Sequence, residues 1–372
     1  MVIQYKCPKC GSDMSYDPNT RKLTCPNCGH AADIEKFPLP EKAPENDEVE
    51  EFCPDDISDE NPIQFDKTYD TEQNRFEGDE ALEYCCNNCG AVIIADADTA
   101  ATTCSFCGAP VVLGDRLSGS LAPAKIIPFK ITKEQAQEAF KKWCRSGRFT
   151  PKDFQMANRI KSIQGMYIPF WLYDVNSAGD ADATCTRVRT FRRGDYDYTE
   201  TSYYHVYRRV NLNYENIPAD ASAKMNDAMM DKLEPYRYDE LIRFNMPYLA
   251  GYLAEKYNYT DEDLFPRIRE RIDRYTDEYI RGSISGYTTV HINRKDIRSR
   301  NLHSDYVLLP VWMVCYDYNK AEHTFAMNGQ TGKIVGKPPK SAGKIAAWFF
   351  GVSGCIFILQ KLISLILGGP LL

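Results

Sequence analysis

Eight cysteines in four Cys-x-x-Cys-Gly motifs have the residue type and the spacing that metal binding requires. Within each pair of motifs, 14 residues separate the two inner cysteines. Two thiolates three positions apart can face one ion from a tight turn, and the glycine that follows allows the positive φ that this turn needs. Two motifs together supply four sulfur ligands, a donor set that selects zinc or iron–sulfur. We therefore predict two zinc ribbons, one with an ion held by Cys7, Cys10, Cys25 and Cys28 and the other with an ion held by Cys86, Cys89, Cys104 and Cys107.

A shell of four thiolates leaves no coordination position for water or substrate, so both predicted zinc ions are structural. Several alternatives compete with parts of this assignment. The cysteines could form disulfides or a thioredoxin-type redox centre, but the first residues carry no apolar signal-peptide core and neither alternative explains the paired spacing. Cys85 could replace Cys86, and His30 could be a ligand. Only Cys86 gives the Cys-x-x-Cys spacing, however, and four thiolates already complete the first site.

The pattern of apolar residues indicates the elements that must position these cysteines. Apolar residues recur at helical spacing in 132–145, 220–233, 248–257 and 261–280, whereas 183–192 and 201–212 are β-rich runs that flank a turn at 193–195. The predicted fold class is α+β, with two small zinc ribbons, an acidic linker, a mixed strand and helix domain, and a C-terminal apolar helix. The predicted domains are 1–34 for zinc ribbon 1, 35–78 for the acidic linker, 79–118 for zinc ribbon 2, 119–338 for the α+β domain and 339–372 for a basic stem and membrane-anchor helix.

Charge is unevenly distributed along the chain. The net charge is −7, but residues 1–120 carry −15 and the remainder carries +8. A ribbon that binds nucleic acid needs a basic surface that displaces counterions from phosphates. The acidic N-terminal part therefore argues against nucleic acid as a partner. Ten acidic residues and one lysine lie between Glu41 and Glu60, a composition typical of a solvated spacer or, alternatively, of a docking peptide for a basic partner.

The C-terminal region contains a long apolar segment. Of the 23 residues in 345–367, only Ser353, Gln360, Lys361 and Ser364 are plainly polar. At about 1.5 Å per residue, a helix of this length covers the roughly 30 Å hydrocarbon core of a bilayer. Lysines at 333, 337, 340 and 344 precede it. The positive-inside rule then predicts a tail anchor in the inner (cytoplasmic) membrane, with the bulk of the chain on the cytoplasmic side. The alternative is a helix that lies in the membrane plane or mediates oligomerisation.

Several phrases of the sequence, together with the doubled ribbon, resemble a family of bacterial membrane-associated proteins with TFIIB-type zinc ribbons. They are IPFKI at 127–131, YIPFW at 167–171, DAS at 220–222, YLAGYLAEKY at 248–257, LPVW at 309–312 and NGQTGK at 328–333. The ribbon cysteines are also similar to those of the primosomal replication helicase. The chain lacks a Walker A loop, so this likeness implies no ATPase.

Three classes of function follow from these features. The first is a non-enzymatic, membrane-tethered adaptor or scaffold that binds partner proteins, themselves membrane-associated, at the cytoplasmic face. The second is a nucleic-acid-binding zinc-ribbon protein in transcription or replication. The third is an enzyme, but the sequence contains no nucleophile elbow, HExxH motif or phosphate loop, and we identify no catalytic or cofactor-binding residue. The sequence favours the adaptor.

A group of arginines in and beside the β-rich runs leaves a further question open. They could bind acidic head groups or RNA, or they could form a solvated face paired with carboxylates. These residues are Arg187, Arg189, Arg192, Arg193, Arg208 and Arg209.

Overall fold

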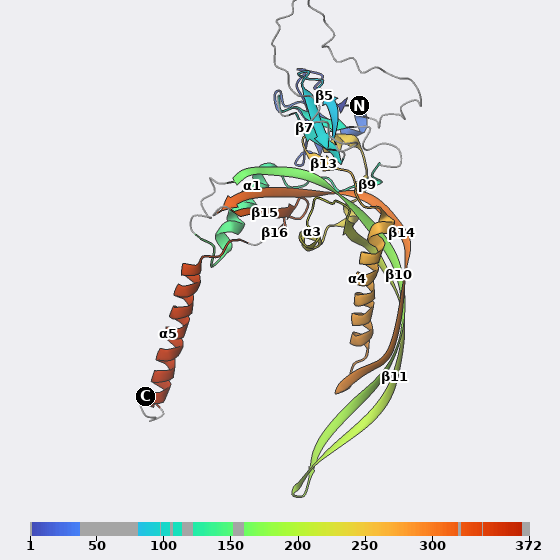
Figure 1. Cartoon of the computed structure of the whole chain (residues 1–372), viewed down its shortest axis with the longest axis vertical. Helices are drawn as coiled ribbons and strands as arrows, with labels where there is room; N and C mark the ends of the chain where they lie inside the picture. The colour runs from blue at the N-terminus through green and yellow to red at the C-terminus, as the bar shows by residue number, and fades with distance from the viewer. Residues whose placement is uncertain are drawn as a thin grey trace, which may run out of the picture. The chain divides into compact units, whose positions relative to one another are not determined.

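The computed structural model describes residues 2–37, 81–96, 98–104, 107–113, 122–151, 160–318, 321–336 and 338–366. Apart from residues 35–37, the predicted acidic linker lies outside these ranges. The fold is α+β, as predicted (Figure 1). The chain forms two compact units that interleave along the sequence. The first, here the ribbon unit, contains Met1–Pro128, Met166–Asp231 and Arg237–Pro310, and the second, here the tail unit, contains Phe129–Gly165, Lys232–Tyr236 and Val311–Leu372.

The first cysteine-rich ribbon is a three-stranded sheet of β2 (Ser15–Asp17), β3 (Lys22–Thr24) and β4 (Ala31–Ala32), followed by the 3-10 helix η1 (Ile34–Lys36). The Asp17 carboxylate accepts hydrogen bonds from the Asn19 amide and the Thr20 hydroxyl. An aspartate that bonds the backbone two residues on is typical of a tight turn. Met14 and the β3 residue Leu23 are fully buried, and β2 and β3 pair as an antiparallel hairpin between the two cysteine motifs.

The second ribbon contributes strands to the main sheet of the ribbon unit. Its hairpin of β5 (Ala81–Cys85) and β6 (Val92–Asp96) is followed by β7 (Thr99–Thr103) and β8 (Pro110–Leu113). Strand β8 pairs with β1 (Val2–Ile3) from the N-terminus, and β7 pairs with β13 (Leu253–Glu255). Within the ribbon unit the strand order therefore begins β1-β8-β7-β13 and continues with β10 (Ile160–Arg193) and β14 (Thr289–Tyr318).

Two very long strands dominate the ribbon unit. Strand β10 (Ile160–Arg193) and strand β11 (Tyr196–Asp220) pair antiparallel from Phe170 opposite Asp220 to Arg193 opposite Tyr196. Gly194 has a φ of 66° in the connecting turn, where a left-handed backbone suits the twist of the two strands. The predicted turn and flanking strands are confirmed, although both strands are longer than predicted. On the other side of β10 lies β14 (Thr289–Tyr318).

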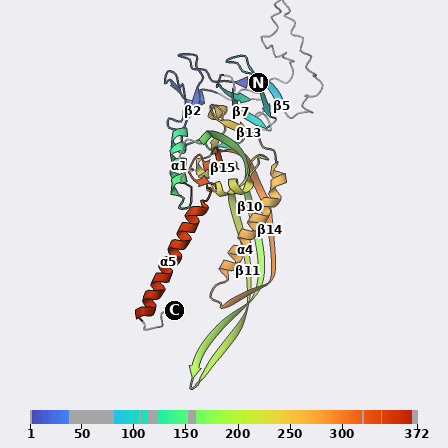
Figure 2. The same ribbon diagram turned by 60° about the vertical axis from the view of Figure 1, so that its left-hand side comes forward.

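Helix α4 (Asp261–Ser283) covers one face of this curved sheet (Figures 1 and 2). Its N-terminus has a capping box between Thr260 and Asp263, which satisfies backbone donors that have no partner inside the helix. The buried side of α4 consists of Leu264, Ile268, Ile272, Thr276 and Ile280. These side chains pack on two clusters from the long strands, one around Tyr173 and Val175 and one around Ala181, Ala183 and Cys185.

Short elements complete the ribbon unit. Strand β9 (Lys125–Ile126) pairs with β14 and with β12 (Ile242–Arg243). The 3-10 helices η5 (Tyr238–Glu240) and η6 (Met246–Leu249) lie on either side of β12 in the sequence. Helix α3 (Asp227–Leu233) passes from the ribbon unit into the tail unit.

The tail unit has an aromatic core. Helix α1 (Lys133–Ser146) starts with a capping box between Thr132 and Gln135. The Phe140 ring lies 5.3 Å from the Phe325 ring, and Phe325 belongs to β15 (Ala321–Asn328). Strand β15 pairs with the end of β14 and with β16 (Ile334–Val335). The unit ends in helix α5 (Ala342–Ile366).

Two predicted helices are wrong. Asp220 ends strand β11, so only Asp227–Leu233 of the predicted helix 220–233 is helical. In place of a helix at 248–257, η6 ends at Leu249, the chain turns at Gly251 with a φ of 91°, and β13 follows. Short apolar runs do not distinguish helix from strand by periodicity. Here strand pairing with β7 and β10 decides the outcome.

Gly251 also determines how the first ribbon packs on the rest of its unit. The Tyr16 amide donates to the Ala250 carbonyl at 2.9 Å, and the Tyr16 and Tyr248 rings lie 5.3 Å apart. A Cβ on Gly251 would lie 2.8 Å from the Ser15 Cβ. We expect Gly251→Ala to lower the free energy of unfolding by about 1–2 kcal/mol, because the left-handed backbone and the close contact both oppose a side chain. Denaturant unfolding would measure it, with Gly282→Ala as control, since a Cβ there meets no atom within 4 Å. Equal effects of the two substitutions would contradict this account.

Candidate metal centres

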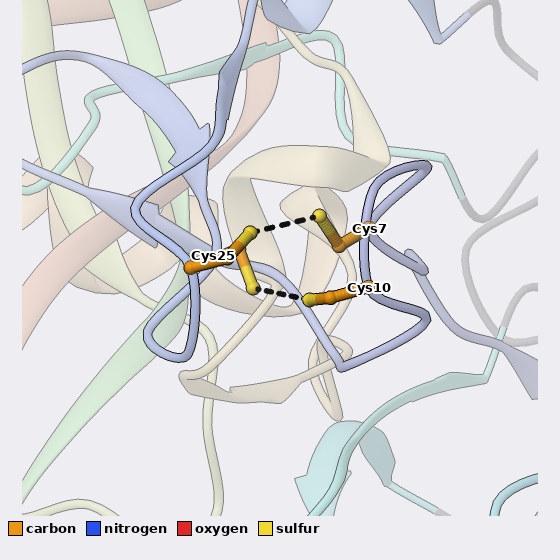
Figure 3. Close-up of side chains that lie close together, drawn as sticks. Cys7, Cys10 and Cys25 are labelled. Carbon is orange, nitrogen blue, oxygen red and sulfur yellow. Dashed lines mark hydrogen bonds between the residues drawn. The ribbon is translucent and has the colours of Figure 1, made fainter.

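The eight predicted cysteines come together as two tetrads. Within each, the four sulfur atoms all lie within 4.8 Å of one another. In the first, Cys7 Sγ lies 3.5 Å from Cys28 Sγ and Cys10 Sγ lies 3.5 Å from Cys25 Sγ. Figure 3 shows Cys7, Cys10 and Cys25 with their sulfur atoms turned toward one another from two separate loops. In the second tetrad, the Cys86–Cys107 and Cys89–Cys104 sulfur distances are both 3.8 Å.

These distances fit a tetrahedral metal site. With zinc–sulfur bonds of about 2.3 Å, the sulfurs at the corners of a tetrahedron are roughly 3.8 Å apart. The two tetrads are the groups of His, Cys, Asp or Glu in the described ranges that lie close enough to hold a metal ion. Each tetrad could therefore hold one ion with no change in backbone position.

All four Cys-x-x-Cys-Gly motifs fold in the same way. In each, the amide of the first cysteine donates to the carbonyl five residues on, and the glycine amide donates back to the carbonyl of the first cysteine, at 2.8–2.9 Å. The four glycines have φ values from 70° to 73°, the left-handed region that glycine adopts without steric cost. The glycines are Gly11, Gly29, Gly90 and Gly108. The repeated turn explains why the sequence requires glycine at this position.

Hydrogen bonds to sulfur favour the thiolate form that a metal needs. The Ser12 backbone amide and then its hydroxyl bond to Cys10 and lower the pKa of that thiol to about 6. In the second tetrad, the Asn88 side-chain amide and the Ala109 backbone amide lower the pKa of Cys107 to about 6. Donors that face a sulfur stabilise its negative charge. The His30 and Ala91 backbone amides act in the same direction on Cys28 and Cys89, but burial and the neighbouring sulfurs raise the pKa of these two thiols to about 12.

The tetrads have one buried side and one exposed side. The first cysteine of each motif is buried and the second is exposed. Cys86 and Cys104 belong to a hydrophobic cluster with Tyr84, Val111 and Leu113, against which Val2 packs. An ion would thus lie between the surface and a small hydrophobic core. A structural metal ion in this position can stabilise a ribbon that is too small to form a large hydrophobic core.

The N-terminal segment links the two ribbons directly. Gln4 Nε2 lies 3.7 Å from Cys86 Sγ, Lys6 Nζ donates to Asn88 Oδ1 at 2.8 Å, and the Asn87 side-chain amide donates to the Val2 carbonyl. Residues just before the first tetrad therefore contact the first motif of the second. The ribbons form one assembly with the main sheet of their unit.

The alternative ligand His30 does not belong to a tetrad. Its backbone carbonyl accepts a hydrogen bond from the Cys25 amide. Cys85 is the last residue of β5, directly before Cys86 of the second tetrad. The described cysteines, the ligands included, are all free thiols rather than disulfides.

A buried acidic group next to β13 was not found from the sequence. Asp220 is 1% exposed, and its Oδ2 has no hydrogen-bond partner within the described residues. Its Oδ1 accepts the Ser222 amide, while the Ser222 hydroxyl donates to Glu255 at 2.8 Å. The only sequence signal was the phrase DAS at 220–222, at the start of the helix predicted for 220–233. Nothing in that phrase indicates that the carboxyl group is buried.

This carboxyl group predicts a pH dependence of stability. Burial raises the pKa of Asp220 to about 7; Asp227 and Glu255 add to the rise, whereas the Ser222 amide and Arg267 oppose it. An unfolded aspartate titrates near 3.9, so between about pH 4 and 7 the folded chain binds a proton that the unfolded chain has lost. Stability is therefore lost as pH rises through this window. Asp220→Asn should match the parent near pH 4 and exceed its free energy of unfolding by up to about 4 kcal/mol at pH 8. Denaturation across that range would test it, and a parallel pH profile for parent and variant would contradict it.

The C-terminal helix has the length and composition of a membrane span. Ala342–Ile363, 22 residues of α5, form the one helix of the described chain that is long and apolar enough, and no part of it is buried within the chain. The apolar segment predicted from the sequence, 345–367, starts three residues after the start of α5 and ends one residue after its end. This observation concerns length and composition alone.

One relative in the comparisons matches almost the whole chain. It is the uncharacterized protein YdjG of Bacillus subtilis (strain 168), 54% identical over 369 residues, which are 99% of this chain and 99% of the relative. No family model and no solved structure matches the chain.

Proposed function

We propose that this chain, which belongs to the family of Bacillus subtilis YdjG, is a membrane-tethered zinc-ribbon adaptor. In this proposal two structural zinc ions fold TFIIB-type ribbons, α5 anchors the chain, and the ribbon unit binds partner proteins. The chain has no catalytic role. Lys340 precedes α5 and Lys344 lies in its first turn, and both favour a cytoplasmic position for the folded units.

The observation that carries the adaptor proposal is the exposed end of the β10–β11 hairpin. Every residue from 187 to 201 is exposed, so this part of the hairpin has no hydrophobic core of its own. Tyr196 and Tyr203 are 71% and 74% exposed. Tyrosine and arginine are the residue types enriched at protein interfaces and among their energetic hot spots. A long exposed hairpin rich in both is suited to hold a protein partner.

The arginines of this hairpin do not form a purely basic face. In the strand register, Arg189 stands opposite Glu200 and Arg192 stands opposite Asp197, and Arg209 Nε lies 2.7 Å from Asp180 Oδ1. Neighbouring carboxylates thus offset several of the positive charges that the hairpin would need to bind nucleic acid phosphates. This arrangement supports a protein partner over RNA or DNA.

Shortening the hairpin tests the proposal. Arg187 pairs with Ser202, so replacing residues 188–201 by Asn-Gly would leave a two-residue turn that suits antiparallel strands. We expect the shortened chain to remain membrane-bound with its metal content unchanged, and to lose the proteins that co-purify with the full chain from solubilised membranes. A parallel variant, Arg269→Glu with Arg274→Glu on the exposed side of α4, should retain them. The same set of bound proteins with and without the hairpin would refute the proposed binding surface.

A further inference from the structure

The end of α1 is attached to the start of α5 within the tail unit. The Ser341 amide donates to the Phe149 carbonyl at 2.8 Å, and Lys344 Nζ donates to the Thr150 carbonyl at 2.7 Å. The rings of Phe149 and Trp348 meet edge to face, with 5.9 Å between their centroids. Residues 149 and 150 therefore lie beside the first two turns of α5.

Four basic side chains occupy the end of α1 and the turn that follows it. All four are exposed, and within the described residues none makes an ion pair or a side-chain hydrogen bond. They are Lys141, Lys142, Arg145 and Arg148, here called the basic collar. The acidic residues of α1, Glu134 and Glu138, lie in its first half. Among the described residues no carboxylate forms an ion pair with the collar, whereas Arg209 of the hairpin is paired with Asp180.

The contact between Phe149 and Trp348 determines where the collar would lie along the membrane normal. Trp348 lies six residues after the start of α5, or about 9 Å along the helix axis. Tryptophan and other aromatic side chains near the end of a span settle at the boundary between head groups and acyl chains. If α5 crosses the bilayer, Phe149 lies at this boundary too. The collar is then held at the level of the lipid head groups.

We propose that the basic collar binds anionic phospholipid head groups and gives the chain a second membrane contact beside α5. The inference rests on the proposed tether and names the lipid class that this surface recognises. Lysine and arginine next to a span are attracted by the negative surface potential of the cytoplasmic leaflet, and arginine can hold a phosphate through two parallel hydrogen bonds. Arg148 directly precedes Phe149, whose ring contacts Trp348 of the exposed apolar helix α5, and this contact makes a membrane the natural occupant of the collar.

Lysine footprinting of the full chain in lipid nanodiscs tests the proposal. The discs contain either phosphatidylcholine alone or phosphatidylcholine mixed with phosphatidylglycerol, and an amine-reactive reagent reports access to each lysine. We expect Lys141 and Lys142 to react roughly fivefold more slowly in the anionic discs, with protection lost at high salt. Lys133, at the other end of α1, should react equally in both. Inorganic phosphate added to the neutral discs should give no protection, and protection there would assign the collar to a soluble anion instead.

A matched pair of charge reversals provides the second measurement. One variant changes the four collar residues to glutamate. The control changes four exposed arginines of the ribbon unit, Arg243, Arg269, Arg274 and Arg300, to glutamate. Native mass spectrometry should show phosphatidylglycerol retained by the parent and the control and lost from the collar variant. Equal loss from both would mean that net charge, and not the collar, attracts the lipid.

The outcomes separate the collar from the tether. A chain that does not stay in neutral discs refutes the tether and the collar with it. A chain that stays in both discs with identical lysine labelling refutes the collar alone.

Discussion

Replacing Cys104 with serine is expected to lower the zinc content from two ions per chain to one and to unfold the second ribbon. Cys104 is 2% exposed and lies in the cluster that supports this ribbon. A structural zinc ion contributes on the order of 10 kcal/mol of apparent binding free energy that is also folding free energy. The damage should spread, because β7 pairs Ala101 with Ala254 and β8 pairs Val112 with Ile3. Hydrogen exchange should therefore accelerate in β1 and β13 as well as in the ribbon.

The same change in the first ribbon should have a more local effect. Its strands β2, β3 and β4 form a separate sheet, so Cys25→Ser should also remove one ion but leave exchange in β13 near the parent rate. Cys85→Ser is the matched control, because Cys85 is next to Cys86 in the sequence but does not fit the Cys-x-x-Cys spacing. It should keep two ions, as measured by elemental analysis of the purified chain. Two ions in Cys104→Ser, or equal exchange in β13 for both ribbon variants, would show that this view of the two sites is wrong.

The tetrads could be predicted from the sequence because their geometry is local. A Cys-x-x-Cys-Gly motif contains its own turn, its own positive-φ residue and both of its sulfurs, so spacing alone places two ligands. The same is true of α1 and α4, whose capping boxes at Thr132 and Thr260 use residues three positions apart. Long amphipathic helices with local caps are the elements that sequence patterns indicate best.

The features that could not be predicted depend on contacts between distant residues. The segment 248–257 has a helical pattern in isolation, but its end forms β13 because β7 and β10 lie on either side of it. In the second half of α4, Thr276 and Ile280 are buried, whereas the larger Tyr279 is 56% exposed. The neighbouring strands decide which side of α4 is covered. For the same reason the burial of Asp220 and the link between Phe149 and Trp348 have no signature in the sequence.

The packing of the ribbons also changes how they contribute to the proposed function. Strands β7 and β8 of the second ribbon belong to the main sheet, and the first ribbon packs on η6. Their metal sites thus support the base of the β10–β11 hairpin, because β13 pairs with both β7 and β10. In the adaptor proposal, zinc acts by holding the hairpin in place, and the hairpin makes the contact with the partner.

A single aspartate at either Ile356 or Ile358 is expected to release the chain from membranes. These residues lie near the middle of α5 and are 59% and 60% exposed. Two positions along a helix correspond to about 200° of rotation, so the two side chains point to nearly opposite sides. An acidic residue in the centre of a span costs about 3 kcal/mol on the insertion scale, equivalent to a shift of roughly 100-fold in the insertion equilibrium. The share of chain that resists carbonate extraction measures this shift.

The pair of positions also distinguishes a span from a helix that lies in the membrane plane. An in-plane helix keeps one polar side toward water, so an aspartate on that side would have little effect. In α5, the four consecutive apolar residues from Ile356 to Leu359 are all exposed and leave no polar side there, and the amine of Lys361 lies over the Phe357 ring at 5.6 Å. We therefore expect Ile356→Asp and Ile358→Asp to release the chain equally, whereas Ile345→Asp, near the start of the helix, should leave it bound. Release by only one of the two central substitutions would indicate an in-plane helix, and release by neither would mean that α5 does not anchor the chain.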